Sequence, residues 1–410
     1  MTMNGSKTEP NTWMTHGFTT YDQTVLYTTD DVTALIQQDA RTPKTNVVAT
    51  QIAAGRYNST NSTGGHAFEF AQWRAQEVLR ADLYVKYADG TEQIIKTDPS
   101  WQVSIDGPVR VSDYYDGETF DARKQIPGWN TASYDASRWA SASAIAGPKG
   151  RVYAQPEEAS QLVQAIHNKV RGVDTFPMWE VSAGVYGVDT LKERQGQPIV
   201  SIWGASAGQV IRVVAVERRN DDGLATTTNN RQDGAFAMPG SMSQQYYISN
   251  GSGTAERPEV FAPTSNVQGF QWVQVAGPAG EALPPSVKVH VDAVWEMRTN
   301  MPPTGTFTSS NTLLNKIHEG VRVGVAVNFT AGQVTDTPTY ERDGWTGDTQ
   351  LMAPSASYLF RTQRQFLKSA QDTVDSQVVG NTYIVNSDVP KPRALGAVGL
   401  LIPSSYGYGY

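Results

Sequence analysis

Apolar and polar residues alternate along the first three quarters of the chain, and this pattern ends near residue 303. Residues 83–87 and 94–96 flank Ala88-Asp89-Gly90-Thr91, which predicts a hairpin with an Asp-Gly turn. Residues 210–216 alternate in the same way, and valines and an alanine at 287, 289, 291 and 293 share one face. The pattern predicts an all-β region. Its length and the loose segment 141–156 favour two β-sandwich domains, residues 1–145 and 146–303.

After Pro303 the spacing of apolar residues becomes helical. They recur every three or four positions over 313–321, and Ser309, Ser310 or Asn311 is available as the N-cap. Residues 351–360 continue the helical pattern, and an apolar stripe follows over 366–378. We therefore expect a third, helical domain over residues 304–410.

Composition excludes several classes of protein. The chain has 410 residues, enough for two or three domains, and no cysteine, which removes disulfides and thiolate metal sites. A net charge of −7 without basic runs argues against a nucleic-acid partner. No apolar stretch is long enough to cross a membrane. The sequence as given begins without a signal peptide, which leaves the compartment open, with an extracellular location slightly favoured.

The densest chemistry lies between the first two predicted helices, at residues 336–348, here called the acidic loop. It combines carboxylates, an arginine and a tryptophan, namely Asp336, Glu341, Arg342, Asp343, Trp345 and Asp348. Glycoside hydrolysis needs paired carboxyl groups, with further polar groups and a ring to hold the sugar. The same composition also suits a solvated, acidic loop between two helices, with the tryptophan anchoring the loop. Composition alone leaves both interpretations open.

Other tempting features receive structural interpretations. The histidines lack ligand spacing, so we assign neither a metal nor a cofactor; they are His16, His66, His167, His290 and His318. Gly204-Ala205-Ser206-Ala207-Gly208 approximates a nucleophile elbow, but no predicted helix follows it, and we interpret it as a turn. The chain is rich in aromatic residues, and β-sheet cores account for them more readily than sugar binding does.

The acidic loop resembles the signature of the bacterial-type α-L-rhamnosidases, glycoside hydrolase family 78. Nine positions match that signature in register: Asp336, Pro338, Glu341, Arg342, Gly344, Trp345, Thr346, Gly347 and Asp348. Tyr340 departs from it, because the family usually has arginine there. Segments 82–101, 115–129, 206–223, 269–275 and 309–315 are also similar to the family, in the same order along the chain.

The resemblance implies an inverting hydrolase that removes terminal α-L-rhamnose, with an (α/α)6 barrel behind β-sandwich domains. It makes Glu341 the general acid and assigns Asp336 and Asp348 to the rhamnose hydroxyls. Trp345 would contact the C6 methyl group, and Arg342 would orient a carboxylate at the substrate site. The implied partner is a carbohydrate, and the oligomeric state stays open.

Length complicates this interpretation. A barrel of twelve helices needs about 200 residues, whereas 107 residues follow Pro303. We therefore expect an incomplete barrel whose helices each expose an apolar face, and a chain that is inactive alone because the catalytic base is missing. Two alternatives remain: a carbohydrate-binding or structural β-domain protein with a vestigial helical tail, and another (α/α)6 enzyme such as a polysaccharide lyase.

Overall fold

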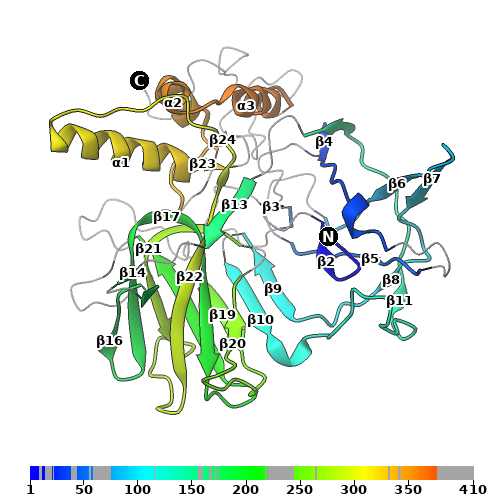
Figure 1. Ribbon diagram of the computed structural model, residues 1–410, viewed down its shortest axis with the longest axis horizontal. Coiled ribbons are helices and arrows are strands. Elements are labelled where there is room, and N and C mark those ends of the chain that lie inside the picture. Colours follow the sequence, from blue (N-terminus) through cyan, green and yellow to red (C-terminus); the bar gives the residue numbers. More distant parts are fainter. Residues whose placement is uncertain are drawn as a thin grey trace.

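The computed structural model describes most of the chain up to residue 375. The residues not described are 9–11, 14–20, 22, 38–43, 55–56, 59–74, 115, 156–159, 166–168, 171–172, 175, 218, 220–243, 264–265, 331–332, 340–341, 343 and 376–410. The described part is mainly β-structure, with three α-helices at one end (Figure 1).

A curled sheet of 11 strands forms the body of the described chain. Its main path runs through β3 (Thr12–Trp13), β13 (Ser160–Ala165), β22 (Lys288–Thr299), β17 (Val185–Trp203), β21 (Gln268–Ala276), β18 (Val210–Val216), β19 (Gln244–Ile248), β10 (Gly117–Asp121) and β9 (Val109–Asp113). Strands β16 (Met178–Ser182) and β20 (Glu259–Phe261) also pair with β17. The predicted strands over 210–216 and near 287–293 are confirmed, as β18 and β22.

Alternating side chains of these strands build the main core. Val200, Ile202, Phe270, Val275 and Val294 have no exposed surface. The predicted face of β22 points inward as well, since Val289, Val291 and Ala293 are buried, as is Val287 just before the strand. A β-strand places every second side chain on the same face, so the alternation in sequence becomes a continuous apolar layer.

Strands from the N-terminal third of the chain join this same sheet. Strand β10 pairs in parallel with β19, and Phe120 stands opposite Tyr247. Strand β3 pairs with β13. Backbone pairing therefore crosses the proposed boundary at residue 145, and the division into domains at 145 and 303 stays a prediction.

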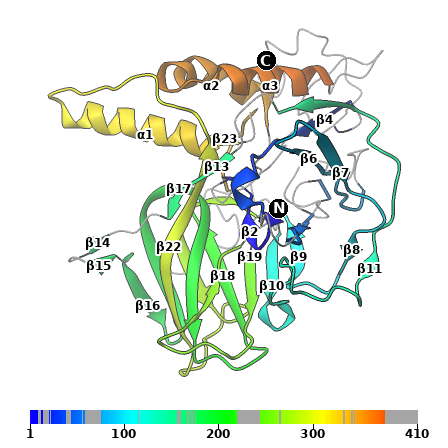
Figure 2. The same ribbon diagram turned by 45° about the vertical axis from the view of Figure 1, so that its right-hand side comes forward.

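Small sheets and single turns make up the rest of the N-terminal part, to one side of the large sheet (Figure 1). The predicted hairpin is confirmed: β6 and β7 pair, and Gly90 in their turn has a left-handed φ of 86°. The elements are β1 (Thr2–Met3), β2 (Ser6–Lys7), β4 (Thr24–Tyr27), η1 (Thr33–Leu35), β5 (Val48–Ala49), β6 (Asp82–Lys86), β7 (Glu92–Lys96), β8 (Gln102–Val103), η3 (Ala122–Lys124), β11 (Ala140–Ser141) and β12 (Arg151–Ala154). The short strands β14 (Lys169–Val170) and β15 (Val173–Asp174) pair with each other and lie on the other side of the large sheet (Figure 2).

The three helices lie together beyond one end of the large sheet in both views (Figures 1 and 2). They are α1 (Thr312–Asn328), α2 (Thr346–Leu359) and α3 (Gln363–Asp375), with the short strands β23 (Phe329–Thr330) and β24 (Gln333–Val334) between α1 and α2. Asn311 caps α1 by accepting hydrogen bonds from the backbone N–H groups of Leu313 and Leu314, as one of the predicted N-caps. Within the described residues, no helix has the length and apolar character to cross a bilayer.

A second, smaller core holds these helices together, and residues 304–375 are here called the helical segment. Phe329, Val334, Ala356 and Phe360 are buried in it, and Phe366 stacks edge-on against Phe329 at 5.5 Å between ring centroids. Much of the apolar surface of the helices nevertheless faces solvent: Leu313, Leu314, Ile317, Val321, Leu351, Tyr358, Leu367 and Val374 are exposed. The expected exposure of apolar helix faces is confirmed; the (α/α)6 architecture stays a prediction.

Candidate functional site

The acidic loop connects β24 to α2. Residues 336–339, 342 and 344–348 are described, whereas Tyr340, Glu341 and Asp343 lie outside the described residues. The assignment of Glu341 as general acid therefore stays a prediction. The described part of the loop differs from the sequence expectation at its end, because Thr346, Gly347 and Asp348 already form the first turn of α2.

The first half of the acidic loop is fastened to β21 of the large sheet. The backbone N–H of Gly269 donates a hydrogen bond to the carbonyl of Pro338 over 2.6 Å. The Thr339 hydroxyl lies 2.8 Å from the carbonyl oxygen of Gly269. A Cβ atom on Gly269 would stand 2.5 Å from Cγ of Pro338, so any larger residue would push the loop away from the strand.

The second half is fastened by Arg342. This side chain is fully buried, and its Nη1 donates to the carbonyl of Val267 over 3.0 Å. Its guanidinium carbon lies 4.7 Å from the ring centroid of Tyr114, which gives a cation–π contact. The backbone of Arg342 has a φ of 52°, an unusual conformation for a residue with a side chain. This placement gives Arg342 an anchoring contact with the large sheet, and its expected role at the substrate stays a prediction.

A buried amide network fixes the surface on which Arg342 rests. The Nδ2 atom of Asn266 donates to the carbonyls of Asp113 and Tyr114 over 3.0 and 2.8 Å. Its Oδ1 accepts from Nε2 of Gln245 over 3.1 Å, and Oε1 of Gln245 accepts from the backbone N–H of Glu118. Three segments far apart in sequence thus support one arginine of the acidic loop.

Asp336, Trp345 and Asp348 of the loop are half-buried. Asp336 follows Thr335, whose backbone N–H donates to the carbonyl of Asn328 at the end of α1 over 2.7 Å. Trp345 occupies the N-cap position of α2, and Asp348 lies in the first turn of that helix. The positive end of the helix dipole favours an anion there. Asp336 and Asp348 thus lie at the two ends of the loop.

Glu217 lies beside the loop and Glu193 is close enough to Glu217 to feel its charge; the sequence alone singled out neither carboxyl group. Glu217 follows β18, and its Oε1 stands 2.5 Å from the hydroxyl oxygen of Thr339. Glu193 belongs to β17, where burial and, secondly, the negative charge of Glu217 raise its pKa to about 8. Glu217 and Thr339 are 122 residues apart, and the sequence contains no local pattern that would have paired them.

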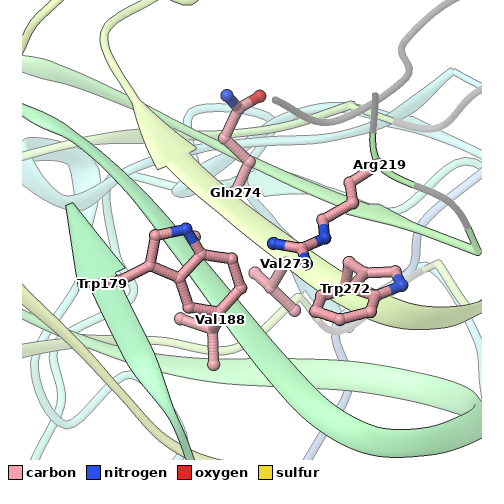
Figure 3. A pocket seen from close by; sticks show the side chains of 7 residues that line it. Trp179, Val188, Arg219, Trp272, Val273 and Gln274 are labelled. Carbon is pink, nitrogen blue, oxygen red and sulfur yellow. The ribbon is translucent and has the colours of Figure 1, made fainter. Parts of the chain in front are cut away.

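A separate pocket on the large sheet is lined by aromatic side chains (Figure 3). The Arg219 guanidinium carbon lies 4.5 Å from the ring centroid of Trp272 and 5.2 Å from that of Trp179. It therefore covers the indole faces that a sugar would need, and we interpret this pocket as a cation–π clamp. Among the described residues, no group of three or more histidine, aspartate or glutamate side chains is arranged to hold a metal ion.

Comparison with known proteins gives consistent results. Residues 1–164 match the α-L-rhamnosidase N-terminal domain, and residues 302–404 match the bacterial α-L-rhamnosidase 6 hairpin glycosidase domain. An α-L-rhamnosidase of Streptomyces avermitilis is 32% identical over 372 residues, which cover 90% of this chain and 32% of that protein. One from Formosa agariphila is 27% identical over 346 residues, which cover 84% of this chain and 34% of the relative.

Solved structures agree with these matches. The crystal structure of the S. avermitilis α-L-rhamnosidase complexed with L-rhamnose superposes with a TM-score of 0.77 at 27% identity, covering 94% of this chain and 34% of that one. The fold also matches native α-L-rhamnosidase from Aspergillus terreus, with a TM-score of 0.74 at 24% identity, over 96% of this chain and 42% of that one. The chain spans about a third of the length of the curated relatives it matches.

Proposed function

The chain belongs to the bacterial-type α-L-rhamnosidase family, and we propose that it contributes to the hydrolysis of terminal, non-reducing α-L-rhamnosides. The observation that carries this proposal is the acidic loop. It matches the family signature at nine positions, and contacts with the large sheet hold it on both sides of Glu341, through Thr339 and Arg342.

The proposed chemistry is inversion at the anomeric carbon. Glu341 donates a proton to the leaving oxygen while a second carboxylate activates water on the opposite face of the sugar. In such enzymes the two carboxyl groups lie about 6.5–9.5 Å apart, which leaves room for that water. We place the acid in this chain and assign the base to helices that would continue an (α/α)6 barrel from α1, α2 and α3.

The flanking residues would bind the sugar. Asp336 and Asp348 lie at the two ends of the acidic loop and are half-buried, so their oxygens can accept hydrogen bonds from rhamnose hydroxyl groups. Trp345, three residues before Asp348, is half-buried, and its ring would offer an apolar face to the C6 methyl group. Arg342 would act indirectly, because its buried side chain holds the loop rather than the sugar.

The general acid is tested by Glu341→Gln in a protein that contains this chain and hydrolyses 4-nitrophenyl α-L-rhamnoside. Loss of general-acid catalysis should lower kcat by about 10²–10⁴-fold on a rhamnosyl disaccharide, whose leaving group needs the proton. The loss should be smaller on the 4-nitrophenyl substrate. Glu180→Gln is the matched control, because Glu180 lies in the β16–β17 hairpin and accepts a hydrogen bond from Gly184. A disaccharide kcat within a few fold of the parent would remove Glu341 from this role.

Sugar binding is tested separately and needs no turnover. Titration calorimetry with free L-rhamnose should show weaker binding in Asp336→Asn and Asp348→Asn than in the parent, because each loses a charged acceptor. Unchanged affinity in both variants would assign these aspartates to the structure of the loop.

A further inference from the structure

The side chain of Glu217, which lies outside the acidic loop, makes a short polar contact with the described part of that loop. Oε1 of Glu217 lies 2.5 Å from the hydroxyl oxygen of Thr339, a separation typical of a hydroxyl donating to an ionised carboxylate. Thr339 is 1% exposed, so its hydroxyl is shielded from water, while Glu217 is half-buried.

The position of Glu217 depends on the large sheet. Val216, the last residue of β18, stands opposite Trp272 on β21, and Gly269 lies three residues earlier on β21. Gly269 is the residue whose backbone meets Pro338 and Thr339. Glu217 and Gly269 therefore approach Thr339 from two neighbouring strands, and both contact its hydroxyl group.

The threonine hydroxyl has one proton and two acceptors within reach. Its oxygen is closer to the Glu217 carboxylate, at 2.5 Å, than to the Gly269 carbonyl, at 2.8 Å. Donation to the carboxylate is the stronger of the two hydrogen bonds, because the acceptor is charged. The neighbouring Glu193 carboxyl group supports this arrangement, since burial and Glu217 raise its pKa to about 8 and it is uncharged at neutral pH.

We propose that Glu217 is a positioning residue for the acidic loop, which it holds through Thr339 two residues before Glu341. Arg342, immediately after Glu341, is held independently at Val267 and Tyr114. In sequence, Glu341 lies between these two contacts with the large sheet, so loss of either contact should lower any activity that depends on this residue. The inference rests on the proposed function for its catalytic consequence, whereas the contact itself can be tested without catalysis.

The contact is tested by hydrogen exchange of backbone amides in this 410-residue chain. Glu217→Leu and Thr339→Val each remove one partner, and each should accelerate exchange in peptides spanning residues 336–348 by about tenfold or more, because local opening becomes easier. The double variant should exchange no faster than the faster single variant, since both remove the same hydrogen bond. Thr339→Ser keeps the hydroxyl and should restore slow exchange.

Two controls separate positioning from general damage. Glu180→Gln removes a carboxylate of the large sheet away from the loop and should leave exchange of residues 336–348 unchanged. Peptides from β21 should stay protected in every variant. If Glu217→Leu does not fold, Thr339→Val against Thr339→Ser still tests the contact, because that pair leaves Glu217 intact.

The catalytic consequence is a kcat effect. In a protein that contains this chain and turns over 4-nitrophenyl α-L-rhamnoside, Glu217→Leu and Thr339→Val should lower kcat by about 10–100-fold and change KM less than threefold, as expected for misplacement of a reacting group. Thr339→Ser should recover most of kcat. The proposal would be overturned if residues 336–348 exchanged hydrogen at the parent's rate in both single variants. It would also be overturned if the effects of the two substitutions added in the double variant. Failure of Glu341→Gln to affect turnover would instead overturn the proposed function and leave the exchange result standing.

Discussion

The large sheet and the helical segment differ in which side chains they bury. In the sheet, apolar side chains point inward, and Ile202 and Phe270 have no exposed surface. In α3 the buried residues are polar, namely Gln365, Lys368, Ser369, Asp372 and Thr373, while Leu367 and Val374 face outward. Helices α1 and α2 likewise expose Ile317 and Leu351.

This difference indicates that burial of apolar side chains stabilises the large sheet more than the helical segment. An apolar face contributes only when it leaves water, at roughly 25 cal/mol per Å² buried. The core residues of the large sheet meet that condition, whereas many apolar residues of the helices, such as Ile317 and Leu351, do not. Exposed apolar faces of this kind mark surfaces suited to a cover, in agreement with the proposal that further barrel helices pack there.

The buried ion pair in α3 is where the comparison predicts the largest single effect. Nζ of Lys368 lies 2.5 Å from Oδ2 of Asp372, and both side chains are almost fully buried. Asp372→Ala should destabilise the helical segment by about 3–5 kcal/mol, because it leaves a buried ammonium group without its counter-ion. The double replacement Lys368→Met with Asp372→Leu should recover most of that loss. Hydrogen exchange in α3 measures both, and equal losses in the two variants would show that the pair is not the cause.

A matched pair of isoleucines tests the contrast between the regions directly. Ile202→Ala should cost about 2–5 kcal/mol, because it leaves a cavity in the core of the large sheet. Ile317 on α1 is 53% exposed, so Ile317→Ala should change stability by less than about 0.5 kcal/mol, helped by the higher helix propensity of alanine. Urea denaturation followed by tryptophan fluorescence gives the first value, and exchange within α1 the second. A large cost at Ile317 would mean that its face is covered in solution.

The buried carboxyl group of Glu193, on β17 of the large sheet, predicts that the stability of the protein depends on pH. Its pKa is raised from 4.5 to about 8 in the folded protein. The folded state therefore keeps a proton that the unfolded chain has lost, and this group's stabilisation declines as pH rises from about 4.5 to about 8. Glu193→Gln should remove the decline and stabilise the protein on the order of 1–3 kcal/mol at pH 9, with little change at pH 4.

Thermal unfolding at pH 4, 7 and 9 measures this effect, with Glu180→Gln as the control. The Tm difference between Glu193→Gln and the parent should grow with pH. A difference independent of pH would assign the effect to packing.

The smallest expected effect concerns the start of α1. Asn311 accepts from the backbone N–H groups of Leu313 and Leu314, over 2.9 and 3.4 Å. Asn311→Ala should weaken α1 by about 1 kcal/mol, whereas Ser310→Ala, at an exposed neighbouring position, should have little effect. Exchange in the first turn of α1 distinguishes them, and equal effects would mean that the side chain of Asn311 does not cap the helix.

Local patterns in the sequence predicted several of the elements. Alternation located β18 and β22, the Asp-Gly pair located the turn between β6 and β7, and three-and-four spacing located α1. These succeed because each element is decided by neighbours within a few residues: side-chain period, turn conformation and N-cap. The acidic loop was found by its spacing of carboxylates, arginine, tryptophan and glycines, and its family signature agrees with the comparisons.

Tertiary structure decided what depends on distant partners. The helical spacing of α1 predicted an apolar stripe, and the expectation that this stripe is exposed came from the length of the chain. Only the structure shows that Ile317 is on the exposed side while Val325 is buried. Arg342 was expected to orient a carboxylate at the substrate site, which stays a prediction, and the structure adds a buried contact with Tyr114, which precedes it by more than 200 residues. The contact between Glu217 and Thr339 exists only because β18 and β21 lie side by side in the sheet. Sequence by itself determined β18, β22, the β6–β7 turn, the start of α1 and the chemistry of the loop, whereas long-range pairing determined which surface holds that loop in place.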